Sequence, residues 1–157
     1  ERTLQVIDYA ILVVSGSEGV QSHTETLWDL LLKYNIPTFI FVNKMDQTGN
    51  EKEVIINELR SNLSEYIIDF SDNLDYELIA TSDENALELY LQDEKLDTGV
   101  IRDLIVDRKV FPCFFGSALK MNGIDHFKLR LCHYHQIQPL NCQPLNALCQ
   151  KIEVSNN

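Results

Sequence analysis

The apolar positions of the chain fall into short unbroken runs, separated by longer segments with helical spacing. Three of these runs have the length of a strand: Tyr9–Val14 ("YAILVV"), Thr38–Val42 ("TFIFV") and Val110–Phe115 ("VFPCFF"). Apolar runs that lack alternating polar residues are typical of strands buried on both faces, as in parallel sheets. The sequence therefore predicts an α/β domain whose parallel sheet is connected by right-handed helical crossovers.

Four helices are expected between and beside these runs: two that begin near residues 22 and 50, and two over residues 83–91 and 97–108. The pairs Ser22 with Glu25 and Asn50 with Glu53 have the spacing of capping boxes, so they predict the first two helix starts. The second helix has an apolar face made of Ile56, Leu59, Leu63 and Tyr66. The third strand contains Pro112, which lacks an N–H donor and therefore predicts an edge position.

Charge and length limit the possible functions. The 157 residues carry a formal net charge of −11, and residues 1–127 alone hold 23 acids and 10 bases. Such a surface repels phosphate backbones, so we expect no nucleic-acid footprint in this segment. No apolar run approaches the ~20 residues needed to cross a bilayer, so no membrane-spanning helix is expected.

Polar loops follow the second and third strands at the sheet edge where parallel sheets bind ligands. They read "NKMD" (Asn43–Asp46) and "GSALKMNG" (residues 116–123). One interpretation is that the strands simply end in turns. The other is that the loops hold a guanine base, whose ring N–H and exocyclic amine offer two parallel donors to a carboxylate such as Asp46. Adenine lacks this donor pair and would leave the carboxylate unpaired.

The other polar groups of the loops suit the same base. Asn43 can bridge the two loops or donate to the far edge of the base, and the methylene stem of Lys44 can cover a ring face. The backbone N–H of Ala118 can donate to a carbonyl oxygen of the base, and the Ser117 hydroxyl can hold the loop.

These loops resemble the motifs of a known family. "FVNKMD" and "FGSAL" are similar to the fourth and fifth guanine-nucleotide motifs of translational GTPases such as elongation factor G and the tetracycline-resistance ribosomal protection proteins. The upstream matches to that family are Gly19-Val20-Gln21, Thr24, Leu27 and Ile36-Pro37-Thr38. The resemblance covers about residues 1–127 and is more specific to the class than to one subfamily.

The resemblance implies a partial P-loop NTPase-type GTPase domain over residues 1–127 that acts in the cytoplasm. It also implies binding of GTP or GDP with Mg²⁺, GTP hydrolysis on the ribosome and, in the resistance subfamily, release of tetracycline. By motif match, Asn43, Lys44 and Asp46 would read guanine with help from Ser117, Ala118 and Leu119.

The chain also departs from the family pattern. It contains neither a GxxxxGK motif followed by Ser or Thr nor an Asp-Thr-Pro-Gly-His motif, so the phosphate-loop half and the Mg²⁺ ligands are missing. We therefore expect that the chain alone does not hydrolyse GTP and binds it weakly, and we assign no catalytic residue. The strand at Tyr9–Val14 would then be an exposed apolar edge.

The tail at residues 128–157 has a different composition, with three of the four cysteines and few charges. The abrupt change predicts an atypical, out-of-frame or disordered tail. Its Cys and His residues lack the paired spacing of a zinc knuckle, so no metal site is expected: Cys132, His133, His135, Cys142 and Cys149.

Three hypotheses about function remain open at this stage. In the first, the chain is part of a ribosome-associated GTPase. In the second, it is a stand-alone guanine-binding module that does not hydrolyse GTP. In the third, it is a non-functional gene remnant.

Overall fold

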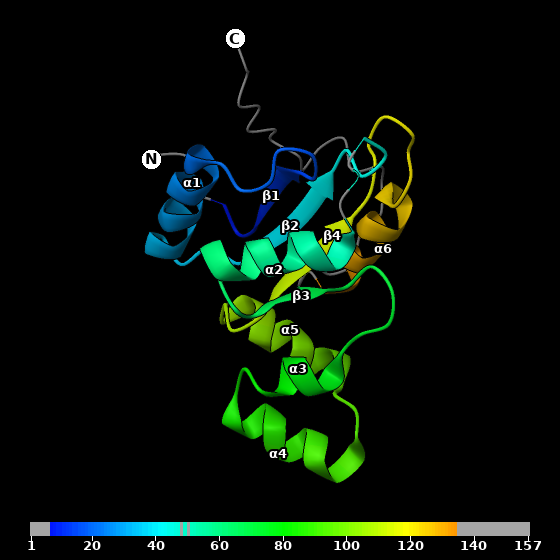
Figure 1. Ribbon diagram of the computed structural model, residues 1–157. Helices are drawn as coiled ribbons and strands as arrows, with labels where there is room; N and C mark the ends of the chain where they lie inside the picture. The colour runs from blue at the N-terminus through cyan, green and yellow to red at the C-terminus, as the bar shows by residue number, and fades with distance from the viewer. Residues whose placement is uncertain (1–6, 48, 50, 135–157) are drawn as a thin grey trace.

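The computed structural model describes residues 7–47, 49 and 51–134, which form a sheet with helices on both faces (Figure 1). The four strands are all parallel, in the order β1-β2-β4-β3: β1 (Ala10–Ser15), β2 (Thr38–Asn43), β3 (Ile67–Asp69) and β4 (Phe111–Phe115). The helices are α1 (Ser22–Lys33), α2 (Lys52–Asn62), α3 (Tyr76–Ala80), α4 (Glu84–Asp93), α5 (Thr98–Val106) and α6 (Ile124–Tyr134). The predicted parallel α/β architecture is confirmed.

Alternation along the strands divides the core into two layers. In β2, Phe39 and Phe41 point to the layer formed with α3, α5 and α6, while Ile40 and Val42 point to the layer formed with α1 and α2. Successive strand residues face opposite sides of a sheet, so one unbroken apolar run supplies both layers. This explains why β2 has no polar face.

The structure contains a strand that the sequence analysis missed. Strand β3 has three residues, and it pairs in parallel with β4, with Ile67 opposite Phe111. As a result β4 lies between β2 and β3, and the predicted edge position of Pro112 is wrong. The N–H groups of Phe111 and Phe115 point to the β3 side, so by alternation the Pro112 nitrogen points to β2. The β2–β4 pairing begins only at Cys113, beyond the missing donor.

The first two helices begin close to the predicted residues, but neither has the predicted side-chain cap at its N-cap residue. Helix α1 begins at Ser22 itself; its N-cap is Gln21, and no side chain caps it, so the Ser22–Glu25 capping box is wrong. The N-cap of α2 is Glu51, also without a side-chain cap, and Asn50 lies outside the described residues. Both helices are therefore held mainly by their buried faces, such as Trp28 of α1.

The β1 strand lies at the end of the sheet that the described residues form. Its Leu12 and Val14 side chains are buried, whereas Ile11 is 38% and Val13 58% exposed. The expected apolar edge is present in this part of the chain.

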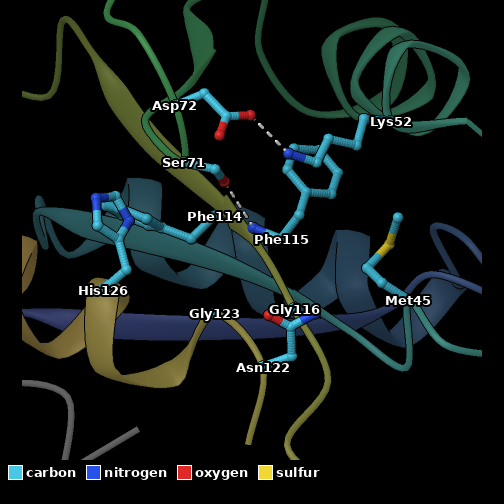
Figure 2. A pocket seen from close by; sticks show the side chains of 10 residues that line it. All are labelled: Met45, Lys52, Ser71, Asp72, Phe114, Phe115, Gly116, Asn122, Gly123 and His126. Carbon is cyan, nitrogen blue, oxygen red and sulfur yellow. Dashed lines mark hydrogen bonds and ion pairs between the residues drawn. The ribbon is translucent and has the colours of Figure 1, made fainter. Parts of the chain in front are cut away.

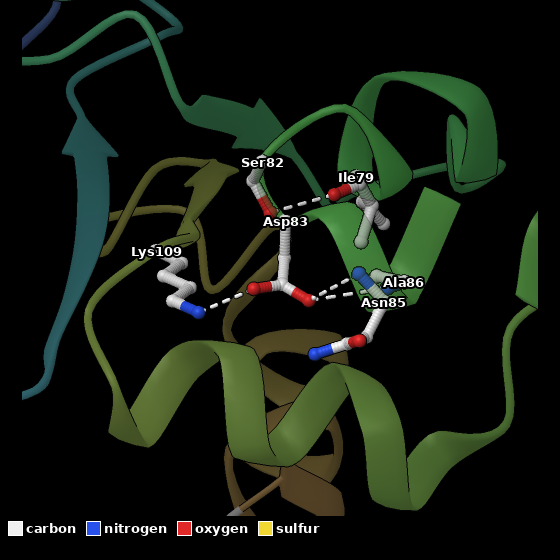
Figure 3. A network of polar contacts seen from close by, with 6 residues as sticks. All are labelled: Ile79, Ser82, Asp83, Asn85, Ala86 and Lys109. Atoms are coloured by element: carbon white, nitrogen blue, oxygen red, sulfur yellow. Dashed lines mark hydrogen bonds and ion pairs between the residues drawn. The ribbon is translucent and has the colours of Figure 1, made fainter. Parts of the chain in front are cut away.

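The N-cap of α4 joins two parts of the fold (Figure 3). The carboxylate of Asp83 accepts hydrogen bonds from the N–H groups of Asn85 and Ala86, and it forms an ion pair with Lys109 ahead of β4. The Lys109 ammonium and these N–H groups hold the pKa of Asp83 below its usual value of 3.8. This cluster fixes the start of α4 relative to the sheet.

Replacing Asp83 with Ala is expected to lower the melting temperature by about 3 to 6 °C, since both the cap and the ion pair are lost. Asp83→Asn, which can still cap the helix, should lose less. Because the folded-state pKa is depressed, the stabilisation is present above pH 3.8 and lost as the pH falls through the folded pKa. Thermal unfolding at pH 7 and pH 3 checks this. The difference in melting temperature between the unaltered protein and the Asp83→Ala variant should be smaller at pH 3, and an equal difference at the two pH values would contradict the role of Asp83.

Helix α6 continues past residue 127, where the sequence analysis places the end of the family domain. Its last residue, Tyr134, is 2% exposed and packs edge-on against Phe70, with ring centroids 5.5 Å apart. Residues 128–134 thus form part of the packed helix, and the rest of the tail lies outside the described residues. The domain division at residue 127 and the out-of-frame origin of the tail stay predictions.

Candidate guanine-binding site

The two polar loops meet because their strands are neighbours in the sheet. Strands β2 and β4 run in parallel side by side, so their carboxyl ends lie at the same edge. The Met45 N–H donates to the Gly116 carbonyl at 3.1 Å, which joins the loops through their backbones. The sequence-predicted residues of the two loops are therefore brought together.

Asn43 forms a second link between the loops. Its Oδ1 atom accepts hydrogen bonds from the N–H of Lys44 at 2.8 Å and from the N–H of Ala118 at 2.9 Å. The Asn43 side chain is thus a bridge, one of the two roles that its position predicts. The Ala118 N–H, expected to face a base, is occupied by this amide oxygen in the structure, so a base would have to exchange with Asn43 for that donor.

Asp46 has a fixed orientation. Its side chain is 12% exposed, and Oδ2 lies 3.6 Å from Nζ of Lys120. Hydrogen bonding from Ser117, then a backbone hydrogen bond and the charge of Lys120, hold the pKa of Asp46 below its usual value of 3.8. Asp46 is therefore an ionised acceptor at neutral pH. The buried Ser117 of the opposite loop accepts a hydrogen bond from the Lys120 N–H through its hydroxyl, which ties Lys120 to the same loop.

The remaining predicted residues line the outside of the loops. Lys44 is exposed and has a left-handed backbone with φ of 62°, a conformation that costs free energy for a residue with a Cβ atom. Leu119 is 81% exposed, so an apolar surface lies beside the polar groups. An exposed aliphatic chain and a carboxylate acceptor together suit a flat heterocycle with N–H donors.

The loop after β4 depends on a close backbone approach. It is closed by a pair of hydrogen bonds between Ser117 and Asn122, at 2.9 and 3.0 Å. Gly123 has φ of 77°, and a Cβ atom there would lie 2.5 Å from the Phe115 carbonyl oxygen. Only glycine fits at position 123. The close packing of its backbone against Phe115 holds the end of the loop that carries Ser117 and Ala118.

The sequence shows no sign that Lys120 lies beside the candidate residue Asp46. It also shows no sign of a cavity that the loop after β4 helps to line through Gly116, Asn122 and Gly123. This cavity has a volume of about 350 Å³ and lies between α2, β4 and α6 (Figure 2). On its rim Lys52 forms an ion pair of 2.8 Å with Asp72 and lies 5.6 Å from the centre of the Phe115 ring. His126 lines the opposite side and accepts a hydrogen bond from Arg130. No sequence signal connects these residues, because they come from four separate segments.

Comparison with known proteins places the chain in a family. A family model described as the elongation factor Tu GTP binding domain matches residues 1–152. The chain belongs to the elongation factor Tu GTP-binding domain family. Among its relatives, a tetracycline resistance protein, TetP of Clostridium perfringens, is 30% identical, and the alignment covers 98% of this chain and 28% of TetP. Another, TetW of Butyrivibrio fibrisolvens, is 32% identical over 96% of this chain and 26% of TetW.

These matches confirm the predicted relationship with translational GTPases of the ribosomal protection type. They also show that the chain spans between a quarter and a third of the length of these two relatives. A solved structure of a Thermus thermophilus protein has a TM-score of 0.68 at 18% identity, covering 83% of this chain and 27% of that chain. That likeness concerns the fold alone.

The missing Mg²⁺ ligands stay a prediction. Among residues 7–47, 49 and 51–134, no group of three or more His, Cys, Asp or Glu side chains is arranged to hold a metal ion. Of the tail residues considered for zinc, Cys132 has an exposed thiol, while His135, Cys142 and Cys149 lie outside the described residues. The same described part of the chain contains no helix long and apolar enough to cross a membrane.

Proposed function

We propose that the chain is the guanine-nucleotide-binding part of a ribosome-associated translation-factor GTPase. The observation that carries the proposal is the Asp46 carboxylate, 12% exposed and 3.6 Å from Nζ of Lys120, at the point where the loops after β2 and β4 meet. A carboxylate in this position pairs with the two adjacent N–H donors of guanine and leaves adenine without a partner. Membership in a family of GTP-binding domains supports the same ligand.

Each site residue has a distinct role in this proposal. Asp46 accepts from the ring N–H and the exocyclic amine, and the aliphatic stem of Lys44 covers one face of the base. Asn43 links the loops through the Ala118 N–H until the base binds. Ala118 donates its N–H to the carbonyl oxygen of the base in exchange for Asn43, and Leu119 covers the edge of the ring. All of these contacts recognise the base, so the chain confers selectivity for guanine rather than phosphate chemistry.

Hydrolysis of GTP requires groups that this chain does not contain. The sequence has no Lys-containing phosphate loop and no water-positioning His motif, on which phosphoryl transfer in such domains depends. We propose that hydrolysis, with Mg²⁺, takes place only where such groups are supplied by a longer protein. The tetracycline resistance proteins among the relatives support ribosomal protection in the cytoplasm as the task of that protein.

The mass of the native protein tests this assignment. An antibody against residues 50–66 would capture the protein from its own cells, and the intact mass and ribosome-stimulated GTPase activity would be measured. A species well above 18.1 kDa that hydrolyses GTP is the expected result. A species of 18.1 kDa that binds GDP without hydrolysis would instead identify a stand-alone guanine-binding module, and one that binds no nucleotide would identify a gene remnant.

Replacing Ser117 with Ala is expected to weaken GDP binding by about tenfold, because the hydroxyl that lowers the pKa of Asp46 and accepts from the Lys120 N–H is lost. The depressed pKa of Asp46 means that binding persists above pH 3.8 and is lost as the pH falls through the folded-state pKa. Without Ser117 the loss should begin at higher pH. Titration of GDP between about pH 3.5 and 7 measures both effects, and identical pH profiles for the two proteins would refute the role of Ser117.

A further inference from the structure

Helix α4 stands apart from the sheet that carries the guanine-binding loops. In Figure 1 it lies beyond α3 and α5, at the opposite end of the molecule from β1. Of its ten residues only Ala86 is buried, and Tyr90 packs partly against the core. Such a short helix is marginal in water without tertiary packing, so its position must be held by other contacts.

The start of α4 supplies those contacts. The Asp83 carboxylate caps the helix through the N–H groups of Asn85 and Ala86, and Lys109 holds the same carboxylate to the segment before β4 (Figure 3). Leu96, which follows the helix, is buried in the core. The helix is therefore fixed at its two ends, and its outward side is not needed for the fold.

Two exposed leucines lie on that outward side. Leu87 is 36% and Leu91 73% exposed, and they are four residues apart, so they lie next to each other on one face of α4. Leu89, which is 43% exposed, lies on a different face of the helix and is not part of this pair. Glu84 and Glu88 have the same spacing, are exposed, and form a neighbouring row. We call these four residues the acidic leucine face.

The charge around this face is strongly one-sided. Residues 75–97 contain eight acids and one base. In the part of the chain that the structure describes, the ion pairs involve neither Glu84 nor Glu88. A second copy of this acidic chain would be repelled here, whereas Lys and Arg side chains around an apolar stripe would be attracted.

We propose that the acidic leucine face is a docking surface for a basic amphipathic helix of a partner protein. Leu87 and Leu91 pack against the apolar stripe of the partner helix, and Glu84 and Glu88 pair with its flanking Lys or Arg side chains. This is the helix-to-helix form of recognition, in which residues at i and i+4 act as anchors. The surface is separate from the guanine-binding loops and leaves them accessible.

A synthetic helical peptide of Leu and Lys with an amphipathic pattern serves as the probe for the 157-residue chain, with fluorescence anisotropy as the readout. Leu91→Gln is expected to weaken binding by about tenfold, because a buried leucine contact is lost. The double change Glu84→Gln with Glu88→Gln should weaken binding about tenfold at low salt and reduce its salt dependence. A peptide of the same composition in scrambled order should bind at least about tenfold more weakly than the amphipathic one.

Leu129→Gln is the matched control, since Leu129 is 69% exposed on α6, far along the chain from α4. It should change the affinity less than about twofold. Equal binding of the Leu91→Gln, Leu129→Gln and unaltered proteins, or no binding of the amphipathic peptide, would overturn the proposal. Self-association that Leu91→Gln abolishes, seen by sedimentation without peptide binding, would also overturn it and assign the face to a second copy.

Discussion

Replacing Asp46 with Ala is expected to abolish discrimination between guanine and adenine nucleotides. In the unaltered chain we expect GDP to bind at least about 100-fold more tightly than ADP, because ADP leaves the Asp46 carboxylate without its two donors. In the variant the ratio should fall to within about threefold, since the remaining contacts of the loops do not distinguish the two bases as strongly. Competition binding with a fluorescent GDP analogue measures both ratios.

Inosine diphosphate refines the same experiment, because its base lacks the exocyclic amine and offers Asp46 one N–H instead of two. Inosine diphosphate should bind the unaltered chain about tenfold more weakly than GDP does. The Asp46→Ala variant should bind inosine diphosphate and GDP with equal affinity. Asp125→Ala is a matched control: this carboxylate is 90% exposed on α6 and forms an ion pair with Lys128. A GDP-to-ADP ratio that persists in the Asp46 variant would remove Asp46 from the site.

Replacing Tyr134 with Ala is expected to lower the free energy of unfolding by about 3 to 5 kcal/mol, the range for truncating a large buried aromatic side chain. Tyr134 is 2% exposed, and its ring packs against Phe70 in the layer that covers one face of the sheet. A loss of this size is a large part of the total stability of an ordinary domain. Urea unfolding followed by the fluorescence of the buried Trp28 measures it.

Two variants of α6 make the Tyr134 measurement specific. Leu129→Ala, at a site 69% exposed, should change the stability by less than about 0.5 kcal/mol. Tyr134→Phe keeps the ring and should lose much less than Tyr134→Ala. If Tyr134→Ala were as stable as the Leu129 variant, residues 128–134 would not belong to the packed domain, and the predicted division at residue 127 would be the true one.

The principal strands could be predicted because their signal is local. The run Thr38–Val42 reads as a fully buried strand in the sequence, and the structure places β2 there with one more residue. Strand β3 could not be predicted in this way, since it has three residues and is a strand only through its pairing with β4. The edge position predicted from Pro112 was wrong for a physical reason. The N–H that proline lacks is not needed at residue 112, because the hydrogen-bonded pairing of β4 with β2 begins only at Cys113.

The candidate site shows the same limit. Asn43, Asp46, Ser117 and Ala118 could be proposed as candidates because the chemistry of each loop and its place after a strand can be read from the sequence. The contacts between these residues could not be read from the sequence. In the structure the Ala118 N–H donates to the Asn43 side chain and is not open to a ligand. Lys120 was missed because its distance from Asp46 depends on how the two loops fold against each other.

The most direct test of the guanine-reading loops is a titration of the isotope-labelled 157-residue chain with guanosine monophosphate and with adenosine monophosphate, followed by the amide resonances. The account predicts that guanosine monophosphate shifts the amide signals of Lys44, Ser117 and Ala118, and that adenosine monophosphate at the same concentration leaves them unchanged. Equal shifts with both nucleotides, or no shift at these three residues, would contradict it.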